Sequence, residues 1–185
     1  MAAPSEALSL KGVRDAAIYA LTTDAIGTLT YGTGFPITIQ EYNWTPDINT
    51  VKLPGNDVTL DIVTHTKGHN GTIKGAKVHK SFVAVLTGAE MSTTATSRMV
   101  EYTGEDVPGY FKTDIKCSYT GTTGECEVIK RYKCKFTNLT YKLTQDDYCE
   151  FSCDWECIPT TYKNAANKTL IGSDVTYATD VDLLS

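Results

Sequence analysis

The stretch Tyr148-Cys-Glu-Phe-Ser-Cys-Asp-Trp-Glu-Cys-Ile158 decides how the rest of this chain can fold. Every second residue is a cysteine or an aromatic residue, and the residues between them are acidic or small and polar. The first set is Cys149, Phe151, Cys153, Trp155 and Cys157, and the second is Glu150, Ser152, Asp154 and Glu156. A period of two is typical of a β-strand with one buried and one solvated face. We therefore expect a strand that lies on an apolar layer beside a polar neighbour.

A second alternating segment, residues 130–136, supplies that neighbour. Its apolar face carries Tyr132, Cys134 and Phe136, and its basic face carries Arg131, Lys133 and Lys135. We expect the two strands to pair antiparallel, with the basic residues opposite Glu150, Asp154 and Glu156. Such cross-strand pairs contribute about 0.2–1 kcal/mol each and help to fix the register.

The remaining segments predict a mainly β chain with one helix. Strands are expected over residues 14–22, 37–44, 58–65, 72–77, 98–103, 110–119, 127–137 and 169–177. The helix is expected over Lys77–Leu86, because Val78, Phe82, Val85 and Leu86 recur at helical spacing and Gly88 stands where a left-handed cap forms. We predict an antiparallel β-sandwich or half-barrel flanked by this helix, with the helix stripe, Phe136, Phe151 and Trp155 in the core.

The length of 185 residues, 41% hydrophobic and 21% charged, fits one domain. We divide the chain into an N-terminal arm (1–13), a β domain (14–160) and a C-terminal arm (161–185). The first residues show no basic segment followed by an apolar stretch, and no run approaches the ~18 apolar residues of a membrane span. We expect a protein that folds in a cytoplasm and does not enter a membrane.

Residues Thr45–Asp57 form a long excursion marked by Pro46 and Pro54. The excursion also contains Ile48, Val51 and Leu53, although protruding loops favour polar residues. Two interpretations stay open: these residues contact a partner, or the loop folds back on its own domain.

The six cysteines all lie after residue 116. Without a secretory signal we expect free, buried thiols in place of disulfides. On a strand, Cys149 and Cys157 would lie roughly 26 Å apart, too far to share one zinc ion. We therefore predict no metal site.

Other chemistry is weakly represented in the sequence. His65, His69 and His79 form no ligand set with the cysteines, and no Gly-rich phosphate loop or Gly-x-Ser-x-Gly motif occurs. The formal net charge of −5 disfavours tight binding of nucleic acid through phosphate contacts. We predict neither an enzyme nor a cofactor.

The order of these parts resembles the major tail tube proteins of long-tailed bacteriophages over roughly residues 12–160. The matching segments are Asp15-Ala-Ala-Ile-Tyr-Ala-Leu-Thr22, Thr30-Tyr-Gly-Thr-Gly34, the long loop, the helix from Ala76 to Gly88, Pro108-Gly-Tyr-Phe-Lys112, Arg131-Tyr-Lys-Cys-Lys135 and the closing strand ending at Ile158-Pro159. The cysteine-rich closing strand departs from the family.

The resemblance implies a structural virion protein, assembled in the bacterial cytoplasm, whose hexameric rings stack into a tail tube. The tube would hold a tape-measure protein, end at tail-tip and terminator proteins, and later let DNA pass without specific binding. The implied contact between rings is the long loop with Pro46, Ile48, Val51, Lys52, Leu53 and Pro54, together with both terminal arms. The expected lumen residues are Asp57, Thr59 and Asp61, since Glu150 and Asp154 have the basic strand as an alternative partner.

Two other functions compete with a tail tube. A head–tail joining or decoration protein would form rings that do not grow into tubes. A β-sandwich adhesin or carbohydrate-binding module would need an exposed aromatic platform, for which Tyr42 and Trp44 are the candidates.

Overall fold

The computed structural model describes residues 10–55, 58–77, 80–119, 124–142 and 150–184. Within them the strands are β1 (Leu10–Ala25), β2 (Thr28–Gly55), β3 (Val58–Lys77), β4 (Glu90–Thr93), β5 (Arg98–Glu101), β6 (Tyr110–Tyr119), β7 (Cys126–Lys142), β8 (Glu150–Cys157) and β9 (Gly172–Tyr177). One helix, α1 (Lys80–Thr87), lies between β3 and β4. The predicted mainly β, antiparallel fold with one helix is confirmed.

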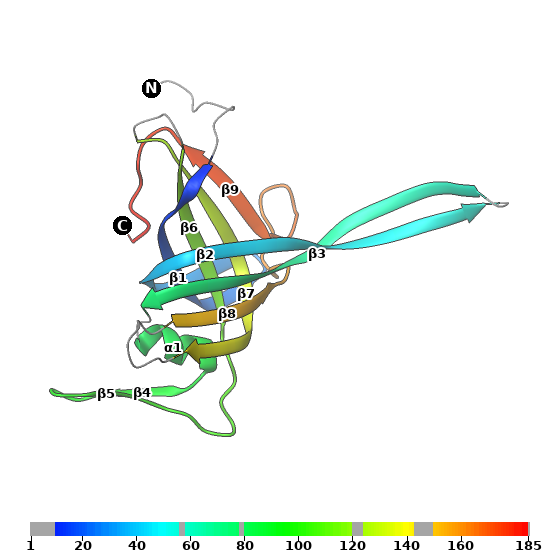
Figure 1. The fold of residues 1–185 in the computed structure, drawn as a ribbon. Coiled ribbons are helices and arrows are strands. Elements are labelled where there is room, and N and C mark those ends of the chain that lie inside the picture. Colours follow the sequence, from blue (N-terminus) through cyan, green and yellow to red (C-terminus); the bar gives the residue numbers. More distant parts are fainter. Residues whose placement is uncertain (1–9, 56–57, 78–79, 120–123, 143–149, 185) are drawn as a thin grey trace.

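Six of the strands curl into a closed barrel in the order β6-β1-β2-β3-β8-β7, because β6 also pairs with β7 (Figure 1). Strand β7 has 17 residues and pairs with three neighbours. Its first half lies between β6 and β9, and its second half pairs with β8. Closure removes the free edges that an open half-barrel would leave in the body of the domain.

The barrel interior is apolar, as the alternation in β8 predicts. Phe151, Cys153, Trp155 and Cys157 are all buried there, whereas Glu150 and Glu156 are exposed. They join buried residues from β1, β3, β6 and α1, namely Ile18, Ile73, Ile115, Phe82 and Leu86. Phe136 is only partly buried and packs at the margin of this cluster.

The helix is shorter than predicted, since it begins at Lys80 and not at Lys77. Val78 lies outside the described residues. Phe82 and Leu86 are buried as expected, but Val83 is buried in place of Val85. These two valines flank the Phe82–Leu86 line on opposite sides, and the Val83 side is the one that is covered. Gly88 ends the helix at a φ of 76°, and its N–H donates to the carbonyl of Ala84 at 2.9 Å, which confirms the predicted cap.

Strands β7 and β8 are antiparallel neighbours as predicted, but most of the charge pairing was assigned wrongly. Lys135 does lie opposite Glu156, whereas Glu150 lies opposite Lys142 and Asp154 opposite Asn138. The reason is that β7 continues to Lys142, so that β8 lies along its second half. The first half of β7 is then free to pair with β9, and Arg131 faces that strand.

The excursion expected at Thr45–Asp57 protrudes, but its described part is a paired strand and not a loop. Strand β2 runs without interruption to Gly55 and pairs with β3 as far as Val58. Pro46 and Pro54, which indicated a loop, are both accommodated in this ladder. The result is a ribbon that projects beyond the barrel (Figure 1).

The described chain after β8 is fastened to its own barrel. Asp24, near the end of β1, accepts hydrogen bonds from the N–H groups of Thr161 and Tyr162 at 2.8–2.9 Å. Its carboxylate also forms an ion pair with Lys133 Nζ at 2.6 Å. Nearer the C-terminus, Asp180 pairs with Lys116 at 3.2 Å. The C-terminal segment thus covers Lys116, which is buried. In the sequence Lys116 alternates with the apolar residues of β6, a pattern that favours an exposed side chain.

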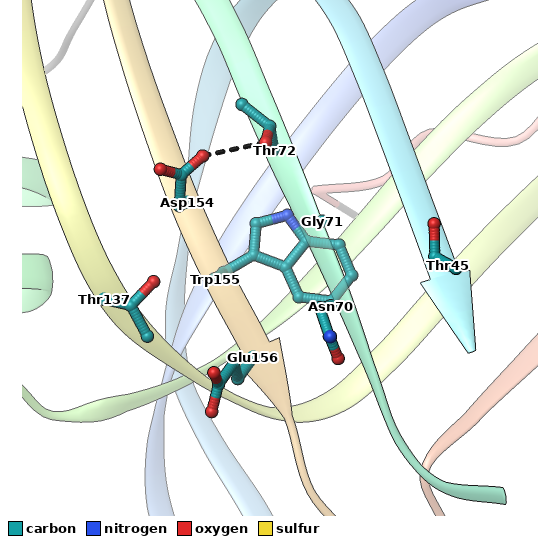
Figure 2. Close-up of a pocket in the computed structure, with 8 residues that line it drawn as sticks. All are labelled: Thr45, Asn70, Gly71, Thr72, Thr137, Asp154, Trp155 and Glu156. Carbon is teal, nitrogen blue, oxygen red and sulfur yellow. Dashed lines mark hydrogen bonds between the residues drawn. The ribbon is translucent and has the colours of Figure 1, made fainter. Parts of the chain in front are cut away.

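Two glycines of β3 face aromatic residues across the β3–β8 ladder. Gly71 lies opposite Trp155, and Gly75 lies opposite Phe151. A Cβ at Gly71 would approach Trp155 Cζ2 to 2.5 Å, and one at Gly75 would approach Phe151 Cε1 to 2.6 Å. Figure 2 shows the indole lying across the backbone at Gly71. The two rings therefore occupy the space that side chains on β3 would take.

This packing predicts that Gly71→Ala destabilises the barrel. The new methyl group collides with the backbone carbonyl of Asn43 on β2 as well as with the Trp155 indole, so both have to shift, at a cost of about 1–3 kcal/mol in the free energy of unfolding. Urea denaturation followed by tryptophan fluorescence measures the change. Gly104→Ala is the control, because a Cβ there meets nothing within 4 Å. Equal stability of the two variants would contradict this account of the ladder.

The Asp24 contacts predict a loss of stability in acid. Burial opposes ionisation of Asp24, but Lys133 and the two backbone N–H groups outweigh it and lower its pKa from 3.8 to about 2. A lowered carboxyl pKa stabilises the fold fully above pH 3.8, and this contribution disappears as the pH falls towards 2.

We expect Asp24→Asn to lower the free energy of unfolding by about 1–3 kcal/mol at pH 7, because a largely buried Lys133 loses its charged partner. The difference from the unmodified protein should shrink between pH 4 and pH 2. Denaturant unfolding across this range checks it, with Asp47→Asn on the exposed ribbon as the control. A difference that stays constant down to pH 2 would refute the role given to the carboxylate.

Candidate assembly surface

The projecting part of the β2–β3 hairpin, residues 45–55 and 58–68, is called the arm below. It is distinct from the N-terminal and C-terminal arms expected from the sequence. The last β2 residue paired with β1 is Ile37, and the first β3 residue along the chain that pairs with β8 is His69. Beyond these points the two strands of the arm pair only with each other among the described residues. Figure 1 shows the arm extending well away from the barrel body.

Exposed β-branched residues occur on both faces of the arm. Val51 lies directly opposite Val63, so these two side chains share one face. Lys52 lies opposite Ile62, and Ile48 stands four residues before Lys52 on that other face. The exposed fractions are 53% for Ile48, 53% for Val51, 55% for Ile62 and 49% for Val63. Covering one face of the arm would therefore still leave apolar surface on the other.

A ribbon of this kind has little stability when no other protein surface covers it. A two-stranded hairpin is at best marginally stable in water, and each of its edges presents unpaired N–H and C=O groups. The described arm carries two acids, Asp47 and Asp61, and two bases, Lys52 and Lys67, which sum to zero charge. A neutral, apolar ribbon of this kind can be stabilised by contacts with another protein surface.

The root of the arm is held by a buried cation and an aromatic ring. The guanidinium carbon of Arg131 lies 4.4 Å from the centre of the Trp44 ring, and Arg131 Nη1 pairs with Asp174 at 2.8 Å. His69 meets the Trp44 ring edge-to-face at 4.9 Å. Burial and the charge of Arg131 lower the pKa of His69 below 6.5. Three strands, β2, β7 and β9, are thereby tied together where the arm leaves the barrel.

A polar groove of about 330 Å³ lies beside this root (Figure 2). It is lined by Thr45, Asn70, Gly71, Thr72, Thr137, Asp154, Trp155 and Glu156. Asp154 accepts hydrogen bonds from Thr72 Oγ1 at 2.8 Å and from Asn138 Nδ2 at 3.3 Å. The sequence had indicated that Asp154 faces the basic residues of β7. In the structure its hydrogen-bond partners are neutral groups instead.

The expected interface and lumen residues fall on one element. Pro46, Ile48, Val51 and Lys52 lie in the β2 strand of the arm and are exposed. The backbones of Leu53 and Pro54 pair with those of Asp61 and Thr59 in the β3 strand, and Asp61 is exposed. Asp57 lies outside the described residues. The two sets are thus neighbours across a single ladder.

Sequence reasoning missed part of the exposed apolar surface. No strand was expected between the helix and residue 98, yet Glu90–Thr93 is a strand that pairs with β5. This hairpin lies against α1 at one end of the barrel (Figure 1). It exposes Met91 and Met99, and the loop that follows exposes Tyr102 and Val107. The adjacent apolar residues Ile62 and Val63 could have indicated the arm from the sequence. Neighbours on a strand point to opposite faces, so both faces of this strand carry an apolar residue.

The described residues offer little other chemistry. No group of three or more His, Cys, Asp or Glu side chains among them is placed to hold a metal ion. No helix in the described part of the chain is long and apolar enough to cross a bilayer. Comparison of the sequence with protein-family models and with curated proteins found no match.

Proposed function

We propose that this chain is a structural virion protein, the subunit of a phage tail tube, and that the arm joins successive hexameric rings. The observation that supports the proposal best is the arm itself, a ribbon with exposed apolar side chains on both faces and no described neighbour beyond its root. The fold agrees with what the resemblance implies: an antiparallel β domain, one helix in mid-chain and a long protrusion between β2 and β3.

The partner of the arm is a second copy of the same chain. Copies with a net charge of −5 repel one another, and residues 45–68, with Asp57 included, carry only −1 of that charge, so the arm can approach another copy at low cost. Apolar residues on both faces suit a ribbon inserted between two subunits, which a tube of stacked rings provides. A contact between unlike surfaces can repeat around a ring and along an axis.

The acidic balance also suits a conduit. A negative inner wall repels phosphates, so that DNA crosses without binding. Asp61 and Thr59, with Asp57, remain our lumen residues, which requires the arm to reach the inner wall. The tape-measure, tail-tip and terminator proteins are the further partners of the proposed tube.

The adhesin alternative has less support. Tyr42 stacks on Trp155 at 5.7 Å, and Trp44 carries Arg131 against its ring. The Tyr42 ring is covered in this way, and the partly exposed Trp44 ring has Arg131 over one face, so the two rings do not form a joint platform. The head–tail joining alternative shares the ring and is separated from the tube by experiment.

Negative-stain electron microscopy of the purified, concentrated full chain tests the proposal. Hollow tubes of six-fold rings are expected. Rings that never stack would replace the tube with the joining role. Persistent monomers at high concentration would contradict self-assembly.

The two faces of the arm yield a sharper prediction. Val51→Asp with Val63→Asp places two charges on one face, and Ile48→Asp with Ile62→Asp places two on the other. Burying a carboxylate in an apolar contact costs several kcal/mol, so each double variant should abolish tubes while thermal unfolding of the barrel stays unchanged.

Ile26→Asp is the matched control, because Ile26 is 82% exposed at the turn between β1 and β2, away from the arm. Its tubes should match those of the unmodified protein. Tubes of normal length from both double variants would show that the arm is not the stacking contact.

A further inference from the structure

Two buried thiols stand opposite each other near the root of the arm. Cys134 of β7 and Cys157 of β8 are direct partners in the ladder and are 0% and 1% exposed. The N–H of Ile158 donates to the carbonyl of Lys133 at 3.0 Å. This bond joins the residue after Cys157 to the residue before Cys134, so the two cysteines occupy a non-hydrogen-bonded position of the antiparallel ladder.

That position brings the two side chains close together. Opposite Cα atoms at non-hydrogen-bonded positions are about 4.5 Å apart, and their side chains share one face. Disulfides span Cα separations of about 4.4–6.8 Å. The other described cysteines have different partners: Cys153 faces Leu139, Cys126 faces Ser118 and Tyr177, and Cys117 faces Val13 and Glu127.

We propose that Cys134 and Cys157 are an oxidisable dithiol that hydrogen peroxide converts into an intramolecular cross-strand disulfide. The overall reaction consumes one peroxide. The two thiols lose their hydrogen atoms and two electrons, one S–S bond forms, and the O–O bond breaks to give two molecules of water. The proposal does not depend on the assembly role of the arm.

The surroundings of the pair indicate which sulfur reacts first. A hydrogen bond from Cys134, the backbone N–H groups of Lys133 and Tyr132, and the charge of Arg131 lower the pKa of Cys157 despite its burial. Burial and the neighbouring Cys157 raise the pKa of Cys134. The Cys157 thiol donates to the carbonyl of Ile171 at 3.2 Å and stands at the end of β8, so opening of this strand end exposes Cys157 before Cys134. In the proposed reaction Cys157 loses its proton, attacks the peroxide oxygen and becomes a sulfenic acid, with release of the first water. Cys134 then attacks this sulfur, breaks the S–O bond and releases the second water.

Access to the buried pair comes from the end of a strand. Cys157 is the last residue of β8, and the next residue, Ile158, is exposed. A molecule as small as hydrogen peroxide reaches the sulfur through local opening at this point, which breaks the bond from the Ile158 N–H to the Lys133 carbonyl while the contacts of Thr161 and Tyr162 with Asp24 hold the following segment in place. His69 lies opposite Cys157 on β3, so the disulfide would join β7 and β8 in the row where the arm begins.

The test treats the reduced full chain with hydrogen peroxide. Free thiols counted in denaturant should fall from six to four, the intact mass should drop by two hydrogen atoms, and a peptide map should show Cys134 linked to Cys157. The melting temperature should rise by about 5–10 °C and return after dithiothreitol, because the bond restricts the unfolded chain.

Cys153→Ser is the matched control, since Cys153 lies on the same face of β8, is equally buried and faces a leucine. This variant should still lose two thiols. Cys134→Ala and Cys157→Ala should each lose none to disulfide formation, with circular dichroism confirming that they fold. If either variant fails to fold, the peptide map of the unmodified protein decides. Retention of all six thiols, or a disulfide that involves any other cysteine, would overturn the proposal.

Discussion

The fold depends on β7 being longer than the strands it pairs with. A strand has two edges, so it can pair with three other strands only if two of them pair with different parts of the same edge. In β7 the shared edge takes β9 over residues 126–131 and β8 over residues 134–142, while β6 occupies the other edge. This sharing closes the barrel, gives the C-terminal segment a place in the sheet, and sets the rows in which Arg131 and Cys134 stand. A β7 that ended at Thr137, as its alternation indicated, would leave most of β8 without a partner on its β7 side, and β8 would pair with β3 alone.

The arm also arises because two strands, here β2 and β3, are longer than the neighbours with which they pair in the barrel. Strands β2 and β3 extend beyond their last pairs with β1 and β8, so their excess length runs into solvent as a ribbon. Ile48, Val51, Ile62 and Val63 each keep about half of their surface in water. Burial of a whole side chain of this type yields about 1.5–3 kcal/mol, so a partner that covers the arm recovers roughly 1 kcal/mol from each. One such contact is weak. In the proposed tube the contact would repeat around each ring and between rings, and the small contributions would add up.

The sequence predicts strands well wherever one face is buried. The period-two pattern of residues 149–157 specifies β8 and its inward side chains, and the same pattern specifies β6 and β7. It fails where both faces are covered or both are exposed. Lys116 looks solvated until the C-terminal segment covers it, and the arm looks like a loop because no buried face imposes a period on it. The pairing partners of Arg131 were equally hidden, because they depend on where β7 ends.

Arg131 shows how the barrel and the arm are connected. Removing a guanidinium from water costs several kcal/mol, and an apolar residue of similar volume would fill the same space at less cost. Arg131 is 1% exposed, so its contacts have to offset that cost. A hydrocarbon side chain packs against any neighbour, whereas the planar guanidinium lies over the Trp44 ring and is paired with Asp174. We interpret Arg131 as the residue that fixes the direction of the arm, since it joins β2 to β7 and β9 at the root. The apolar core then supplies the stability of the barrel, and this polar contact selects the direction in which the ribbon leaves it.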